Sequence, residues 1–202
     1  QAGDNPTASI QVTSDAGSHE IKVPVFKPAA PLPKDITGFV ESHGYVCMEA
    51  EHFTRSESRG GAAWEIIKGL GRSGDVVTVL PPTVPSRTTE DEIRSSSPSL
   101  EYDFHVFQSG EARLDFDCLP TKAVAPKRGV RLVIAIDGQV PLIIDGSGGD
   151  VLANLRRKTT KVKIDKPGKH VLTVWMVDPA VVIDKIVMHF GEPRDSYLGP
   201  LE

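Results

Sequence analysis

Short stretches of alternating apolar and polar residues, broken by turns, dominate the chain from Gly44 onward. Successive side chains of a β-strand point to opposite faces, so this alternation is typical of strands that contribute one face to a core. Many short strands separated by turns predict an all-β fold, specifically a two-sheet β-sandwich. The candidate strands are Tyr45–Glu51, Asp75–Leu80, Leu100–Phe107, Glu111–Cys118, Val130–Ile136, Pro141–Asp145, Lys161–Ile164, His170–Met176 and Val182–Phe190.

Turn sequences between these strands predict local connections. Asp137 and Gly138 tolerate the positive φ angles of a tight hairpin turn, so they predict a hairpin between the flanking strands. Residues 166–169, Lys-Pro-Gly-Lys, predict a second hairpin that joins 161–164 to 170–176. The strand 170–176 carries apolar residues on both faces, which predicts a central place in its sheet. Gly and Pro account for 18 and 16 of the 202 residues, which leaves little room for long helices.

Two segments and the N-terminal part of the chain differ from this pattern. Residues 55–61 and 81–98 are polar and rich in Gly or Pro, and we expect long surface loops there. Residues 1–43 contain two short alternating runs and then three prolines within 27–33, which suit an extended connector. The sequence therefore predicts an N-terminal segment and linker with edge strands at 1–43, followed by a β-sandwich domain at 44–202.

Charge and apolar content exclude two classes of partner. The chain has 23 basic and 27 acidic residues, a net charge of −4 and no long run of either sign, so we expect no nucleic-acid partner. No stretch approaches the roughly 18 apolar residues of a membrane span, so we expect no membrane partner. The chain begins with Gln1 rather than Met, which we interpret as processing or excision from a longer protein.

Catalytic chemistry has little support in the sequence. The nucleophile elbow, the zinc-protease helix, the phosphate loop and the dinucleotide fingerprint are all missing. The six histidines lie in separate segments, without a spacing that would bring two imidazoles to one metal. Cys47 and Cys118 form either one disulfide or two buried thiols, and the tendency of free cysteine to pack as a small hydrophobe favours thiols. An autonomous enzyme is therefore the weakest hypothesis.

One pair of carboxylates has a notable spacing. Glu49 and Glu51 lie two positions apart in a predicted strand, and this places both side chains on the same face. Two carboxylates on one face repel each other unless a cation lies between them, and calcium prefers such hard oxygen ligands. The alternative is an exposed strand whose Glu side chains lie in water, and the spacing alone favours this alternative.

The Glu-Ala-Glu sequence at 49–51, together with the apolar strand VVIDKIV at 181–187, resembles the carbohydrate-binding modules of families 6 and 35. A more specific resemblance is to the C-terminal domain of glycoside hydrolase family 115, the xylan α-1,2-glucuronidases, and it extends from about Val23 to the end. Four segments carry it in the same order: GFVESHGYVCMEAEHFT (38–54), WEIIKGLGRSG (64–74), WMVDP (175–179) and SYLGP (196–200).

The resemblance implies a jelly-roll, galactose-binding-like β-sandwich with a structural calcium, whose ligands map onto Glu49, Glu51 and Asp184. The catalytic acids of the family lie in an upstream region, so no catalytic role falls on any residue here. It also implies a secreted or periplasmic protein that is an accessory module of an α-glucuronidase. The partners would then be plant cell-wall polysaccharide and the catalytic domain of the parent enzyme.

Sugar recognition requires an aromatic face and a few fixed polar groups. Trp64 lies in a predicted loop between two glycine-rich turns, and Arg72 has the forked guanidinium that suits a uronic acid carboxylate, so this pair is the leading candidate. Asn154 and Asp178, in loops, are candidates for hydrogen bonds to hydroxyls, although turn stabilisation explains both equally well. The expected ligand is glucuronic-acid-decorated xylan or arabinogalactan. The alternative is a structural or homodimerisation domain that packs on the catalytic region without a ligand of its own.

Overall fold

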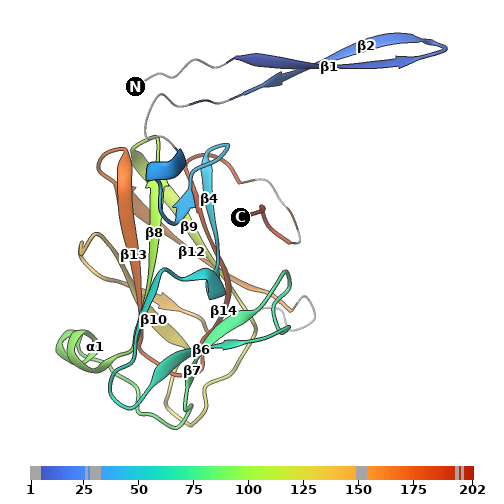
Figure 1. Ribbon diagram of the computed structural model, residues 1–202. Helices are drawn as coiled ribbons and strands as arrows, with labels where there is room; N and C mark the ends of the chain where they lie inside the picture. The colour runs from blue at the N-terminus through green and yellow to red at the C-terminus, as the bar shows by residue number, and fades with distance from the viewer. Residues whose placement is uncertain (1–5, 26, 28–32, 149–153, 194–195, 197) are drawn as a thin grey trace. The chain divides into compact units, whose positions relative to one another are not determined.

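The computed structural model describes residues 6–25, 27, 33–148, 154–193, 196 and 198–202 (Figure 1). The chain divides into two compact units, Gln1–Ile36 and Thr37–Glu202. The boundary lies at residue 37 rather than at the predicted residue 44. The reason is that β3 (Phe39–Val40) pairs in parallel with β8 (Ser99–Val106) and is therefore part of the second unit.

The second unit is a β-sandwich, as predicted, and consists of two six-stranded sheets. We call them sheet I and sheet II. Sheet I has the order β11-β10-β13-β8-β3, with β5 also paired to β8, and sheet II has the order β12-β9-β14-β7-β6, with β4 also paired to β14. The remaining strands of sheet I are β11 (Leu142–Asp145), β10 (Arg131–Ile136), β13 (Gly168–Met176) and β5 (Arg55–Glu57). Those of sheet II are β12 (Arg156–Ile164), β9 (Gly110–Cys118), β14 (Val182–His189), β7 (Val76–Leu80), β6 (Ala63–Ile67) and β4 (Tyr45–Glu49).

The core lies between the two sheets and follows the alternation of the strands. In β9, Leu114, Phe116 and Cys118 point into the core, whereas Asp115 and Asp117 lie on the outer face of sheet II. Sheet I contributes a matching inner layer, whose largest members are fully buried. Both cysteines are buried free thiols, as favoured by the sequence, and burial raises the pKa of each thiol to about 12.

One of the two predicted hairpins is confirmed. Asp137 and Gly138 have φ angles of 50° and 70° and connect the antiparallel strands β10 and β11. Strand β13 lies between β10 and β8, which confirms its predicted central place. The hairpin predicted at residues 166–169 is wrong, because β12 pairs with β9 in sheet II whereas β13 belongs to sheet I. The Pro-Gly sequence reverses the chain there, but the reversal carries it from one sheet to the other.

The two predicted surface loops contain short regular elements. Strand β5 forms within 55–61 and pairs with β8. Within 81–98 the helix α1 (Glu90–Ser96) begins with a capping box, in which Thr89 and Glu92 satisfy each other's backbone amides. Two single 3₁₀ turns, η1 (Pro33–Asp35) and η2 (Ala50–His52), complete the described elements.

The first unit contains a hairpin of β1 (Thr7–Ser14) and β2 (Gly17–Pro24), which pair in register along their whole length. Residues that face each other across the pair share one face of the ribbon. One face is therefore mainly apolar, with His19 and Ser14 as its polar members, and the other is mainly polar. Every residue of both strands is exposed. The apolar face consists of Ala8, Ile10, Val12, Ile21 and Val23.

Candidate functional site

The three predicted calcium ligands come from three elements around one loop. Glu49 ends β4, Glu51 lies in η2, and Asp184 lies in β14 beside an irregularity of its pairing with β9. The prediction that Glu49 and Glu51 share one face of a strand is wrong, because the strand ends at Glu49 and the chain then turns. All three carboxylates nevertheless accept hydrogen bonds from the loop at residues 72–75.

These bonds orient the carboxylates toward a glycine-rich turn. The Ser73 hydroxyl donates to Glu49 at 3.1 Å, and the Asp75 amide donates to Glu51 Oε1 at 2.9 Å. The Arg72 amide donates to Asp184 Oδ1 at 3.0 Å. The other oxygen of Glu51, Oε2, is buried and has no hydrogen-bond partner. A buried carboxylate oxygen without a partner is costly, and a cation bound beside it would offset this cost.

Two glycines permit the close approach of these oxygens. A Cβ atom at Gly71 would lie 2.6 Å from Asp184 Oδ1 and 2.7 Å from the carbonyl oxygens of Gly74 and Asp75. A Cβ atom at Gly74 would lie 2.5 Å from Glu51 Oε1. Carboxylate and carbonyl oxygens around a compact turn are the ligand types that calcium takes, so Glu51 and Asp184 fit such an ion.

Glu49 fits the ion less well, because the protein already neutralises it. Lys185 Nζ lies 2.9 Å from Glu49 Oε1, so this carboxylate has a cationic partner without any metal. Burial raises the pKa of Asp184, and the backbone amide of Arg72 only partly offsets this effect. Among the described residues, no group of three His, Cys, Asp or Glu side chains lies at metal-binding distances. A cation here would therefore depend on backbone carbonyls as well as on Glu51 and Asp184.

The residues predicted to bind sugar are separated and mostly buried. Trp64 was expected in a loop, but it lies in β6, is only 5% exposed and donates its indole N–H to the Pro98 carbonyl at 3.1 Å. The loop prediction is wrong because Trp64 pairs with Val79 of β7, so the glycines on either side flank a strand. The Arg72 side chain is 3% exposed and contacts Asp117. The pair of Trp64 and Arg72 therefore offers no accessible surface to a ligand.

The other two candidates differ in exposure. Asn154 is exposed at a turn, with a φ angle of 49°. The Asp178 carboxylate is fully buried and accepts hydrogen bonds from the Ser86 hydroxyl at 2.6 Å and from Arg131 Nε at 2.8 Å. These bonds join the loop before α1, the start of β10 and the turn before β14. Asp178 is therefore a structural residue in this arrangement.

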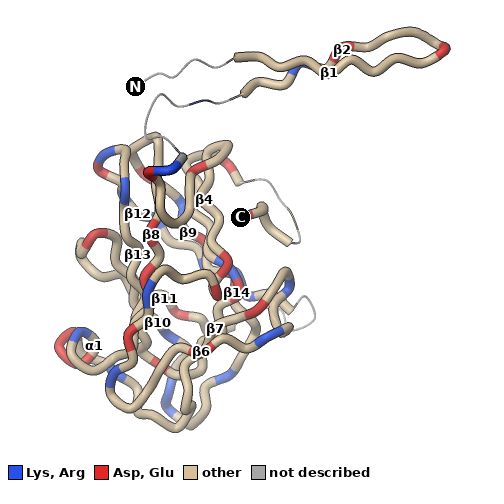
Figure 2. Tube along the Cα trace, in the orientation of Figure 1, with Lys and Arg blue, Asp and Glu red and all other residues tan. Residues whose placement is uncertain are grey.

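The outer face of sheet II carries a further polar constellation among the described residues, and none of the predicted sugar-binding residues belongs to it. The register of β12, β9, β14 and β4 aligns its side chains in three rows. The first row alternates in charge and consists of Arg157, Asp117, Lys185 and Glu49. The second consists of Thr159, Asp115, Val187 and Cys47, and the third of Lys161, Arg113, His189 and Tyr45. Charged residues of both signs are interspersed along these strands (Figure 2).

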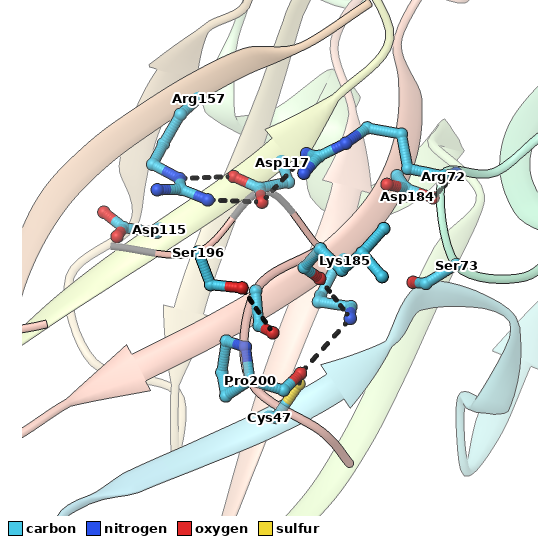
Figure 3. A network of polar contacts seen from close by, with 12 residues as sticks. Cys47, Arg72, Ser73, Asp115, Asp117, Arg157, Asp184, Lys185, Ser196 and Pro200 are labelled. Atoms are coloured by element: carbon cyan, nitrogen blue, oxygen red, sulfur yellow. Dashed lines mark hydrogen bonds and ion pairs between the residues drawn. The ribbon is translucent and has the colours of Figure 1, made fainter. Parts of the chain in front are cut away.

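Much of this outer face is buried, although it does not face the core. Asp115, Asp117 and Lys185 are 2%, 1% and 3% exposed. Within the face, Arg157 donates two hydrogen bonds to Asp117, at 2.6 and 2.8 Å (Figure 3). Buried charges of this kind are rare unless they are paired. The sequence offers one signal for such a face, since acidic and basic residues alternate with core residues on adjacent strands.

C-terminal residues contact part of this face. We call Pro193, Ser196 and Leu198–Glu202 the C-terminal strap. Lys185 Nζ donates to the carbonyl oxygens of Leu198 and Pro200, at 2.9 and 3.3 Å, and the Cys47 thiol donates to that of Pro200 (Figure 3). His52 pairs with Glu202 at 2.7 Å. Few apolar contacts hold the strap, because Leu198 and Leu201 are 50% and 84% exposed.

Comparison with solved structures finds similar chains at low sequence identity. A family 115 4-O-methyl-α-glucuronidase, BtGH115A, described as specific for decorated arabinogalactans, superposes with a TM-score of 0.56 at 16% identity. The match covers 83% of this chain and 20% of that enzyme, so the chain spans about a fifth of its length. A family 35 carbohydrate-binding module from Clostridium thermocellum matches with a TM-score of 0.48 at 15% identity, over 71% of this chain and 97% of the module.

The other two comparisons are with curated protein sequences and with sequence models of protein families. No curated protein sequence matches the chain. No helix in the described part of the chain is long and apolar enough to cross a membrane. The sequence model of the glycosyl hydrolase family 115 C-terminal domain, however, matches residues 38–202, which is nearly the whole of the second unit. The chain therefore belongs to the family of glycosyl hydrolase family 115 C-terminal domains, a non-catalytic part of these glycoside hydrolases.

Proposed function

We propose that this chain is the carbohydrate-binding accessory domain of a secreted or periplasmic α-glucuronidase that degrades plant polysaccharide. The observation that carries the proposal is the family match over residues 38–202 on a sandwich of the carbohydrate-binding-module type. The proposed ligand is glucuronic-acid-decorated xylan or arabinogalactan. Arabinogalactan is supported by the description of the family 115 relative. The domain would hold the polysaccharide near the active site of its parent enzyme.

Isothermal titration calorimetry against glucuronoxylan and arabinogalactan, each in calcium-containing buffer, tests the proposal. A shallow sugar site buries little surface, so we expect modest affinity for at least one of the two polysaccharides. Dextran serves as the control polymer of similar size. No heat with either plant polysaccharide would overturn the proposed function.

We also propose that a structural calcium ion binds at the glycine-rich turn, with Glu51 and Asp184 as its carboxylate ligands. The unpartnered Oε2 of Glu51 and the carbonyl oxygens near Gly71 support this proposal. When bound, the ion would neutralise the two carboxylates and link η2 to β14. Glu49, the third ligand implied by the resemblance, would remain paired mainly with Lys185.

A second candidate function has its own supporting observation. The apolar face of the β1–β2 hairpin is exposed along its whole length, and a two-stranded hairpin in water is only marginally stable by itself. A domain that packs on the catalytic region of its enzyme would bury such a face. This structural function is compatible with sugar binding elsewhere on the domain.

Substitution of two hairpin residues tests the packing function. The double variant Ile10→Thr, Ile21→Thr keeps β-branched side chains but removes apolar surface from the exposed face. In a complex with the catalytic region of the parent enzyme, we expect it to weaken association, as measured by sedimentation velocity. The control Ser9→Thr, Lys22→Thr alters the polar face only and should leave association unchanged. Equal association of both variants would count against a packing role for the hairpin.

A further inference from the structure

A cavity of about 400 Å³ lies on the outer face of sheet II, beside the C-terminal strap. Tyr45 and His189 form its floor, from the row in which these two residues face each other across β4 and β14. Ser196 and Pro200 of the strap contribute one wall. Cavities that hold small ligands have volumes of about 300–1,000 Å³, so this one has room for a sugar residue.

A tight turn before β4 positions the lining residues at one end of the cavity. His43 and Gly44 have φ angles of 53° and 81°, and Ser42 bridges to Tyr45 across the turn. Two successive positive φ angles define the turn that suits the twist of a hairpin, and glycine meets this requirement at the second position. The imidazole of His43 is fixed by a hydrogen bond of 2.8 Å between its Nδ1 and the Ser42 hydroxyl. The turn therefore holds His43 and Tyr45 at the same end of the cavity.

The polar groups of the cavity suit hydroxyl groups. The Tyr45 ring offers an apolar surface for the C–H face of a pyranose, and its phenol group both donates and accepts hydrogen bonds. Burial lowers the pKa of His189, so its imidazole is mainly neutral at pH 7 and has one donor and one acceptor nitrogen. The Glu192 carboxylate is a strong acceptor for sugar hydroxyls.

The charge of the cavity distinguishes between sugar classes. Its described lining includes Glu192 but no Lys or Arg. Two arginines of this outer face have acidic partners, since Arg113, in the same row as His189, pairs with Asp115 and Arg157 pairs with Asp117. A uronic acid carboxylate placed in the cavity would lie near Glu192, and no Lys or Arg of the described lining would compensate it. The cavity is therefore suited to a sugar residue without a charge.

We propose that this cavity is a sugar subsite that takes one neutral pyranose of the polysaccharide and excludes its uronic acid. The proposal rests on the proposed carbohydrate-binding function and gives it a location. It differs from the site predicted at Trp64 and Arg72, which are buried. It also assigns the C-terminal strap a direct part in binding, because strap residues form one side of the subsite.

Calorimetric titration of the full chain with two oligosaccharides tests the proposal. One is a neutral xylo-oligosaccharide, and the other is the same oligosaccharide with glucuronic acid on every xylose. We expect the neutral form to bind more tightly. Tyr45→Ala should weaken its binding about tenfold or more, because the stacking surface is lost. Phe107→Ala, which removes a partly exposed ring directly after β8, is the control and should bind like the wild type.

A charge substitution provides a second and independent readout. Glu192→Gln should raise the affinity for the glucuronic-acid form relative to the neutral form, because it removes the repelling carboxylate. Circular dichroism establishes that each variant is folded. If the wild type binds neither oligosaccharide nor either polysaccharide, the proposed function fails. If it binds while Tyr45→Ala and Glu192→Gln bind just as the wild type does, the function stands and this subsite is wrong.

Discussion

Replacing Asp178 with alanine is expected to lower the free energy of unfolding by about 2–4 kcal/mol. The carboxylate is fully buried and accepts bonds from the Ser86 hydroxyl, the Arg131 backbone amide and the Arg131 guanidinium. Its removal leaves these donors without their acceptor, although the Arg131 side chain is 34% exposed and regains some water. The melting temperature, followed by circular dichroism, should fall by roughly 5–15 °C.

The same carboxylate gives a defined pH dependence. Burial raises the pKa of Asp178, but the hydrogen bonds from Arg131 and Ser86 outweigh this effect, and the net pKa lies below the usual value. A carboxyl group with a lowered pKa in the folded state stabilises the protein above its unfolded pKa of about 3.9. This stabilisation is lost as the pH falls through the folded pKa. The stability difference between wild type and Asp178→Asn should therefore be largest near pH 7 and decrease below about pH 4.

A surface carboxylate provides the control for both measurements. Asp165 pairs with Lys163 at 3.0 Å, but its side chain is 63% exposed. Asp165→Ala should change stability by less than about 0.5 kcal/mol. If Asp178→Ala had the same melting temperature as Asp165→Ala, the structural role of Asp178 would be contradicted.

Calcium is expected to raise the melting temperature, and EDTA is expected to reverse the increase. Binding to the native state alone contributes about 2.7 kcal/mol when the calcium concentration is a hundred times Kd. For a domain of this size the increase corresponds to roughly 5–10 °C. Glu51→Gln should remove most of the response, because it replaces the carboxylate whose Oε2 has no protein partner. Differential scanning fluorimetry with and without the ion provides the measurement.

A variant of Glu49 tests whether the ion has two carboxylate ligands, Glu51 and Asp184, or also has Glu49 as a third. If Glu49 remains paired with Lys185, Glu49→Gln should keep more of the calcium response than Glu51→Gln. An equal loss in both variants would restore Glu49 as a full ligand. A melting temperature that is indifferent to calcium and EDTA, together with no metal by elemental analysis, would refute the calcium site. Lys185 and the hydrogen bonds from residues 72–75 would then compensate these carboxylates without a metal.

The elements that the sequence predicts correctly depend on local patterns. The strands follow from alternation, and the turn at Asp137 and Gly138 follows from residues that accept positive φ. The partner of a strand is not a local property. Residues 166–169 reverse the chain as expected, but whether β13 then joins β12 or the opposite sheet is decided by how the two sheets pack.

At the candidate site, the burial of side chains is likewise not a local property of the sequence. Glycines on both sides of Trp64 indicate a loop, but pairing with β7 makes the segment a strand and buries the ring. Asp115 and Asp117 alternate with core residues, which is typical of a solvated face. Both are nevertheless buried. Residues of the strap, about 80 positions later in the chain, lie beside Asp115, and Arg157 and Arg72 contact Asp117. A pattern of alternation gives the face of a side chain, not what lies above that face.

The rows of sheet II also restrict how the chain can fold. Sliding β9 by one residue against its neighbours would turn Asp115 and Asp117 toward the core and Phe116 toward water. The same slip would separate Arg157 from Asp117. Misaligned pairings of β9 with β12 and β14 are thus penalised twice, by buried charge and by lost ion pairs. The outer face therefore disfavours incorrect strand registers during folding, whether or not a ligand ever binds to it.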